Sequence, residues 1–120
     1  MTLIVQILVG IVALLHLGFL ILEMFLWNTP RGRAIFGTTR EFAAESATLA
    51  ANQGLYNGFL GAGLVWGMIA ADPVGFQVTV FFLVCVVIAG VYGARTVNRR
   101  ILFIQAVPAV VALAAVLVSR

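Results

Sequence analysis

The sequence predicts an all-α integral membrane protein, a four-helix bundle that fills residues 1–120 as a single domain. Hydrophobic residues make up 63% of the chain and charged residues 9%, whereas a soluble domain carries about 25% charged residues. The charged residues also lie between four long apolar runs or, for Arg120, after the last of them. A soluble domain this small cannot bury so much apolar surface, because small domains leave much of their surface exposed. Lipid is therefore the expected solvent.

Each apolar run is long enough to cross a bilayer core of about 30 Å as a helix, which takes about 20 residues. Helices are expected because an isolated strand would leave its backbone groups unpaired in lipid. The expected helices cover residues 3–27, 39–71, 73–95 and 101–119. The first apolar run, Leu3 to Leu22, is interpreted as part of a retained helix, since Glu23-Met24-Phe25-Leu26-Trp27 follows the run where a signal peptide would have a small-residue cleavage site.

The second helix is the longest, and at about 1.5 Å per residue it exceeds the bilayer core, so its first turns are expected at the membrane surface. Asn28 to Gly32 is interpreted as a turn cluster. Thr38 is the expected N-cap of the second helix, with Glu41 reaching back to complete a capping box. Pro108 predicts a kink in the fourth helix.

Seven basic residues, all of them arginines, set the expected orientation. Arg31, Arg33 and Arg40 separate the first two runs, and Arg95, Arg99 and Arg100 separate the last two, while Arg120 alone follows the fourth run. Basic connections stay in the cytoplasm, so both termini are expected outside, in the inner (plasma) membrane. Lipid headgroups, rather than nucleic acid, are the expected partners of these arginines.

Polar residues inside the apolar runs are the candidates for function, because ionisable groups in a membrane are costly and tend to be functional. His16 and Glu23 are two helical turns apart and share a face. Counting residues from the ends of the runs places Glu23 opposite Asn52 and Gln53, and His16 opposite Tyr56 and Asn57. The candidate ligand-pocket residues are His16, Glu23, Glu45, Asn52, Gln53, Tyr56, Asn57 and Gln105.

The alternative is that these residues only hold the helices together, at about 0.6 kcal/mol each. No CxxC pair, HExxH motif or phosphate-binding glycine loop is present, and neither a second histidine nor a cysteine pair supports a zinc site. No catalytic residue, metal or cofactor is therefore assigned, and whether the chain is an enzyme stays open.

Three functions fit these observations. The first is a cytoplasm-facing polar pocket for a small or lipid-like ligand, such as a quinone or a lipid. The second is a small proton-coupled exporter, and the third is a structural subunit of a membrane complex. Small residues spaced four apart, among them Gly54 with Gly58 and Gly63 with Gly67, predict close helix contacts within the bundle or in a homo-oligomer.

A family resemblance rests on His16, Glu23-Met24-Phe25-Leu26-Trp27, Phe36-Gly37 and Ala51-Asn52-Gln53-Gly54-Leu55-Tyr56-Asn57-Gly58. This combination resembles the bacterial domain-of-unknown-function family numbered 1304 over nearly the whole chain. The resemblance implies a four-helix membrane bundle without an established activity. The build is also similar to that of DoxX-like four-helix proteins, some of which work with quinones, which is an analogy at the level of fold alone.

Overall fold

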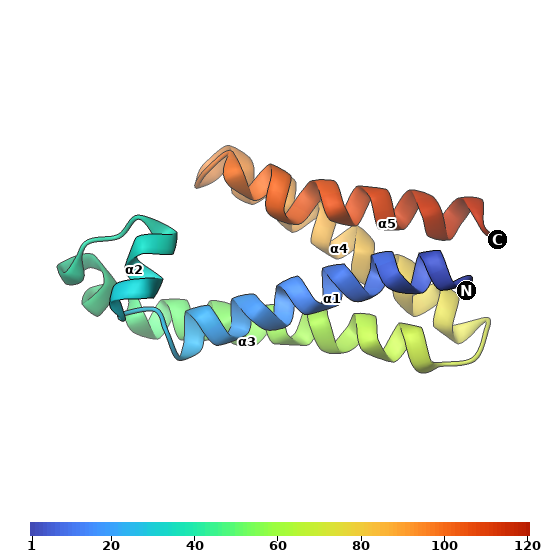
Figure 1. Ribbon diagram of the computed structural model, residues 1–120, viewed down its shortest axis with the longest axis horizontal. Helices are drawn as coiled ribbons and strands as arrows, with labels where there is room; N and C mark the ends of the chain where they lie inside the picture. Colours follow the sequence, from blue (N-terminus) through green and yellow to red (C-terminus); the bar gives the residue numbers. More distant parts are fainter. The chain divides into compact units, whose positions relative to one another are not determined.

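The computed structural model describes residues 1–120, and all of its regular structure is helical (Figure 1). The all-α prediction is therefore confirmed. In chain order the elements are α1 (Leu3–Met24), α2 (Pro30–Phe36), α3 (Arg40–Ile69), α4 (Val74–Thr96), the π-helical segment η1 (Leu102–Ala106) and α5 (Val107–Val118).

The chain divides into two compact units, which we describe separately. Unit 1 comprises Met1–Leu15 and Leu60–Arg120, and unit 2 comprises His16–Phe59. The boundaries fall within α1 and within α3, so each of these helices contributes one end to each unit.

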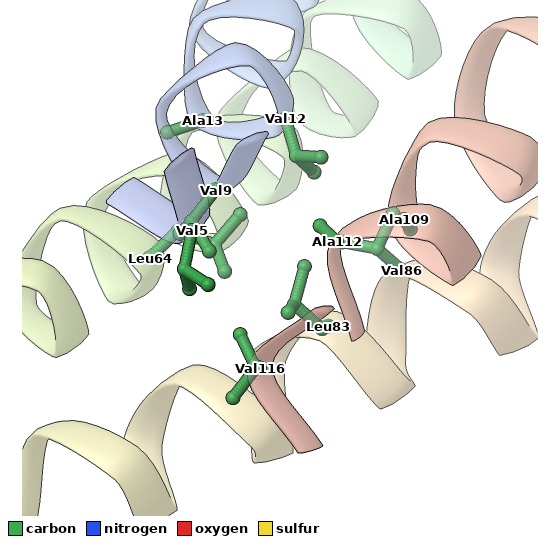
Figure 2. Packing of buried hydrophobic residues seen from close by; sticks show 10 residues of the cluster. All are labelled: Val5, Val9, Val12, Ala13, Leu64, Leu83, Val86, Ala109, Ala112 and Val116. Carbon is green, nitrogen blue, oxygen red and sulfur yellow. The ribbon is translucent and has the colours of Figure 1, made fainter. Parts of the chain in front are cut away.

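The core of unit 1 is apolar and takes side chains from α1, α3, α4 and α5 (Figure 2). On α1, Val5, Val9 and Val12 recur at the spacing that places residues on one helical face. On α5, Ala109 and Ala112 supply small side chains that allow close packing. The buried residues of this core are Val5, Val9, Val12, Ala13, Leu64, Leu83, Val86, Ala109, Ala112 and Val116.

Two helices, α1 and α4, are long and apolar enough to cross a membrane. In each, 28% of the most apolar 18-residue stretch is buried inside the structure, whereas the core helix of a soluble protein is mostly buried. The helix α3 has the length, but Asn52, Gln53 and Asn57 lower its hydropathy. The apolar segment Leu102–Val118 is shorter than α1 and α4.

The fourth expected helix is divided into η1 and α5. Pro108 has no N–H to donate, and its ring excludes the carbonyl group four residues earlier from an α-helical position. In the structure the Val107 N–H donates to the carbonyl oxygen of Leu102, five residues back. The predicted disturbance at Pro108 thus takes the form of a π-helical segment before it.

The short helix α2 begins inside the segment expected as a turn cluster, at Pro30. Thr29 Oγ1 accepts a hydrogen bond of 3.1 Å from the Gly32 N–H, and Pro30 occupies the first turn. Threonine at the N-cap and proline at the first helical position both favour helix initiation. Gly37, with φ of 66°, then ends α2 in the left-handed conformation that glycine adopts readily.

The N-cap of α3 is Thr39 and not Thr38. Thr39 Oγ1 accepts a hydrogen bond of 3.1 Å from the Phe42 N–H, and α3 begins at Arg40. With Thr39 as the cap, the residue at the third helical position is Phe42, which has no side-chain group to complete a capping box. The capping box predicted between Thr38 and Glu41 is therefore wrong.

Two predicted glycine contacts are confirmed, one in each unit. A Cβ atom added to Gly63 would collide with the ring of Phe82 in unit 1. One added to Gly58 would collide with Cδ1 of Leu20 in unit 2. Both glycines therefore pack directly against a side chain of a neighbouring helix, which would have to move to admit a larger residue.

Candidate ligand-binding site

The polar centre of unit 2 is a hydrogen bond between Glu23 on α1 and Asn57 on α3. The side-chain amide Nδ2 of Asn57 donates to Oε1 of Glu23 across 34 positions of sequence. Asn57 is buried, with 6% of its surface exposed, and Glu23 is partly buried. Buried polar groups are nearly always hydrogen-bonded, and here each of the two satisfies the other.

Glycines on α3 bring the two helices close enough for this bond. A Cβ atom on Gly54 would lie 2.8 Å from Cγ of Met24 and 3.0 Å from Cβ of Glu23. Gly58 lies one turn after Gly54 on α3 and contacts Leu20, which lies one turn before Met24 on α1. Residue numbers rise on α1 as they fall on α3, so the two segments run antiparallel in unit 2.

This register differs from the one obtained by counting residues from the ends of the apolar runs. That count placed Glu23 opposite Asn52 and Gln53, whereas Glu23 lies against Gly54 and bonds to Asn57. The steric fit of Gly54 and Gly58 fixes the register, and a count of residues along each run carries no information about that fit.

Trp27 attaches the end of the α1 region to α3. Its indole Nε1 donates to Oγ of Ser46 at 3.0 Å, and Ser46 Oγ donates in turn to the carbonyl oxygen of Phe42 at 2.6 Å. The Trp27 ring also packs on Phe36, with ring centroids 4.8 Å apart. Sequence reasoning did not identify Ser46, because no motif distinguishes this serine from any other small polar residue of a helix.

Four candidate residues lie on exposed surface of α3. Glu45, Asn52 and Gln53 are exposed, and Tyr56 is 54% exposed. The Tyr56 ring packs edge-on against Phe59, with ring centroids 5.8 Å apart. The structure therefore brings Asn57 to Glu23 and leaves these four side chains accessible on α3.

The two remaining candidates differ in position. His16 has none of its surface exposed, and its ring meets the ring of Phe19 edge-on, with centroids 5.4 Å apart. Gln105 belongs to η1 in unit 1 and is partly buried.

The chemistry available in unit 2 is that of hydrogen bonding and proton exchange. Side-chain amides donate and accept, a carboxyl group accepts and can carry a proton, and the Tyr56 hydroxyl does both. Such groups suit a ligand with a polar head that has both donors and acceptors. Two cavities of the structure lie elsewhere, in unit 1; one of them, of about 290 Å³, is lined by Met1, Asp72, Pro73, Phe76, Val116, Ser119 and Arg120.

Comparison with known proteins gives a family and no activity. The family model described as "Protein of unknown function (DUF1304)" matches residues 10–117. The chain is similar to the "Uncharacterized protein YpaA" of Lactococcus lactis subsp. lactis (strain IL1403), with 30% identity over 115 residues, covering 94% of this chain and 96% of that protein. No solved structure matches the chain. The match spans both units, and the chain belongs to the DUF1304 family.

Proposed function

We propose that this chain is a multi-pass inner-membrane protein that binds a small or lipid-like ligand at the cytoplasmic end of α1 and α3. In this proposal α1, α3, α4 and the η1–α5 segment form a four-helix membrane bundle, with both termini outside. The observation that carries the ligand site is the hydrogen bond between Glu23 and Asn57.

The exposed apolar surface supports the membrane part of the proposal. Leu3, Ile4 and Leu14 on α1 are 75%, 70% and 70% exposed, and Phe81 and Ile88 on α4 are 62% and 64% exposed. Large apolar side chains that are exposed in such numbers are typical of helices that contact lipid or other proteins. Contact with lipid would account for the exposed apolar side chains of both α1 and α4.

The polar surface of α3 supports the ligand part of the proposal. Asn52, Gln53 and Tyr56 are exposed and lie within two turns of the Glu23–Asn57 bond. A polar group within a membrane is costly unless protein, water or a ligand satisfies it. A quinone or lipid headgroup, with several acceptors and an apolar tail, would satisfy these amides and place its tail in the hydrocarbon.

The orientation predicts a labelling pattern. In a Cys85→Ala background, a cysteine introduced at Thr2 or Ala71 should react with an impermeant maleimide added to intact cells. Cysteines at Ala34 or Asn98 should react only after permeabilisation, because the arginines of those two connections resist translocation. Labelling of Ala34→Cys in intact cells would show that the proposed orientation is inverted.

Ligand retention tests the proposed function directly. Mass spectrometry of the gently purified protein should find a copurifying small molecule in the wild type. Its occupancy should fall about tenfold in Glu23→Gln, because the loss of one hydrogen bond of about 1.4 kcal/mol lowers affinity about tenfold. Glu23→Gln preserves size and an acceptor for Asn57, so the fold should be kept; Gln77→Ala, an exposed change on α4 in unit 1, is the matched control.

Other outcomes would contradict the proposal. Unchanged occupancy in Glu23→Gln would show that the ligand does not bind at this site. A stoichiometric protein partner with no bound small molecule would favour a structural subunit. Proton uptake that depends on a transported substrate in proteoliposomes would instead identify an exporter.

A further inference from the structure

A cavity in unit 1 combines two arginines with an apolar wall. It lies where the end of α4 meets η1 and has a volume of about 520 Å³. Its lining residues are Val91, Ala94, Arg95, Arg99, Leu102 and Phe103. None of these residues belongs to the site in unit 2, so the cavity is separate from the proposed ligand site.

Close backbone packing holds the walls of this cavity. A Cβ atom on Gly90 would lie 2.8 Å from the backbone nitrogen of Ala106, and one on Gly93 would lie 3.1 Å from Cγ2 of Ile101. The carbonyl oxygen of Gly93 accepts hydrogen bonds from the N–H groups of Val97 and Asn98, at 2.8 and 3.2 Å. The chain between α4 and η1 is thus a defined turn that carries Arg99.

The two guanidinium groups have no carboxylate of their own unit to pair with. Asp72 is the only acidic side chain of unit 1, and it caps the opposite end of α4, where its Oδ1 accepts from the Phe76 N–H at 3.1 Å. Arg95 lies in the last turn of α4, about 35 Å away at 1.5 Å per residue. The planar guanidinium group matches phosphate geometry, so an anion from outside the unit fits here.

The apolar side chains that line the cavity indicate that the anion carries a hydrocarbon chain. Val91, Leu102 and Phe103 are 42%, 37% and 68% exposed beside the arginines. A free inorganic anion would leave these side chains uncovered, whereas an anion with a hydrocarbon chain covers them. Phe103 is the largest of the three and belongs to the π-helical segment η1. Segments of this kind are found frequently at functional sites.

We propose that this cavity binds one anionic phospholipid, with its phosphate between Arg95 and Arg99 and an acyl chain along Leu102 and Phe103. Both features are needed: the guanidinium pair selects a negative headgroup, and the apolar wall selects a lipid over free phosphate.

The test measures lipid retention by native mass spectrometry of the full chain titrated with dioleoylphosphatidylglycerol or dioleoylphosphatidylcholine. Retention of phosphatidylglycerol should fall about fivefold in Arg95→Gln and in Arg99→Gln, as expected for one arginine near an anionic headgroup. Arg100→Gln is the matched control, because it removes the same charge from the same turn at a residue that does not line the cavity. Retention of the zwitterionic phosphatidylcholine should change little in all three.

A further variant tests the apolar wall. Phe103→Ser should weaken phosphatidylglycerol retention while both arginines remain, and Arg95→Lys should recover part of the retention lost in Arg95→Gln. Equal losses in Arg100→Gln and Arg95→Gln would overturn the proposal in favour of a diffuse charge effect. Displacement of phosphatidylglycerol by millimolar inorganic phosphate, with Phe103→Ser behaving as wild type, would show a phosphate site and overturn the lipid assignment.

Discussion

Gly90→Ala is expected to destabilise the protein by about 2–3 kcal/mol, within the range that overpacking costs. A Cβ atom on Gly90 would lie 2.8 Å from both Cβ and the backbone nitrogen of Ala106 and 2.9 Å from its Cα. Two of these three atoms belong to the backbone, so no side-chain rotation relieves the collision. The helix α4 and η1 would have to separate, and the packing of unit 1 around α5 would loosen with them.

Gly18→Ala is the matched control, because it makes the same chemical change inside a helix. Nothing lies within 4 Å of a Cβ atom added to Gly18, and alanine favours a helix over glycine by about 1 kcal/mol. The control should therefore raise the midpoint of thermal unfolding in detergent, while Gly90→Ala should lower it. A Gly90→Ala protein as stable as the wild type would show that α4 and η1 do not pack this closely.

The helices themselves could be predicted because apolar runs bounded by charges and prolines determine them. The short helix α2 was missed although its signals are in the sequence: a threonine cap, a proline at the first turn and a glycine after the last. These residues also favour turns, and α2 is too short to show a periodic apolar pattern. The π-helical register of η1 depends on how Pro108 is accommodated against α4, which no local pattern reveals.

The candidate site could be predicted in part. Glu23 and Asn57 were identified because polar residues are rare in apolar runs, and the structure joins them. Their pairing was not predicted, because the helix register depends on which glycines admit the neighbouring helix. Counting residues from the ends of the apolar runs placed Asn52 and Gln53 opposite Glu23, whereas both are exposed in the structure.

Asn57→Leu is expected to destabilise the protein by about 1–3 kcal/mol, the cost of leaving a buried polar group without its partner. Leucine has nearly the shape of asparagine but cannot donate to Oε1 of Glu23. The partly buried carboxyl group of Glu23 would then lose its donor from α3. Asn52→Leu, an exposed change on the same helix, is the control and should alter stability by less than about 0.5 kcal/mol.

A double-mutant cycle with Glu23→Leu separates the bond from the packing around it. If Asn57 stabilises the fold through Glu23, the double variant should lose less stability than the two single variants together, with a coupling of about 0.5–3 kcal/mol between contacting residues. Thermal unfolding of all four proteins in one detergent gives the coupling. Additive losses would mean that Asn57 and Glu23 act separately, because removing the carboxyl group would then leave the contribution of the amide unchanged. In that case the contact between α1 and α3 in unit 2 would not depend on this hydrogen bond, and the bond would no longer support a ligand site.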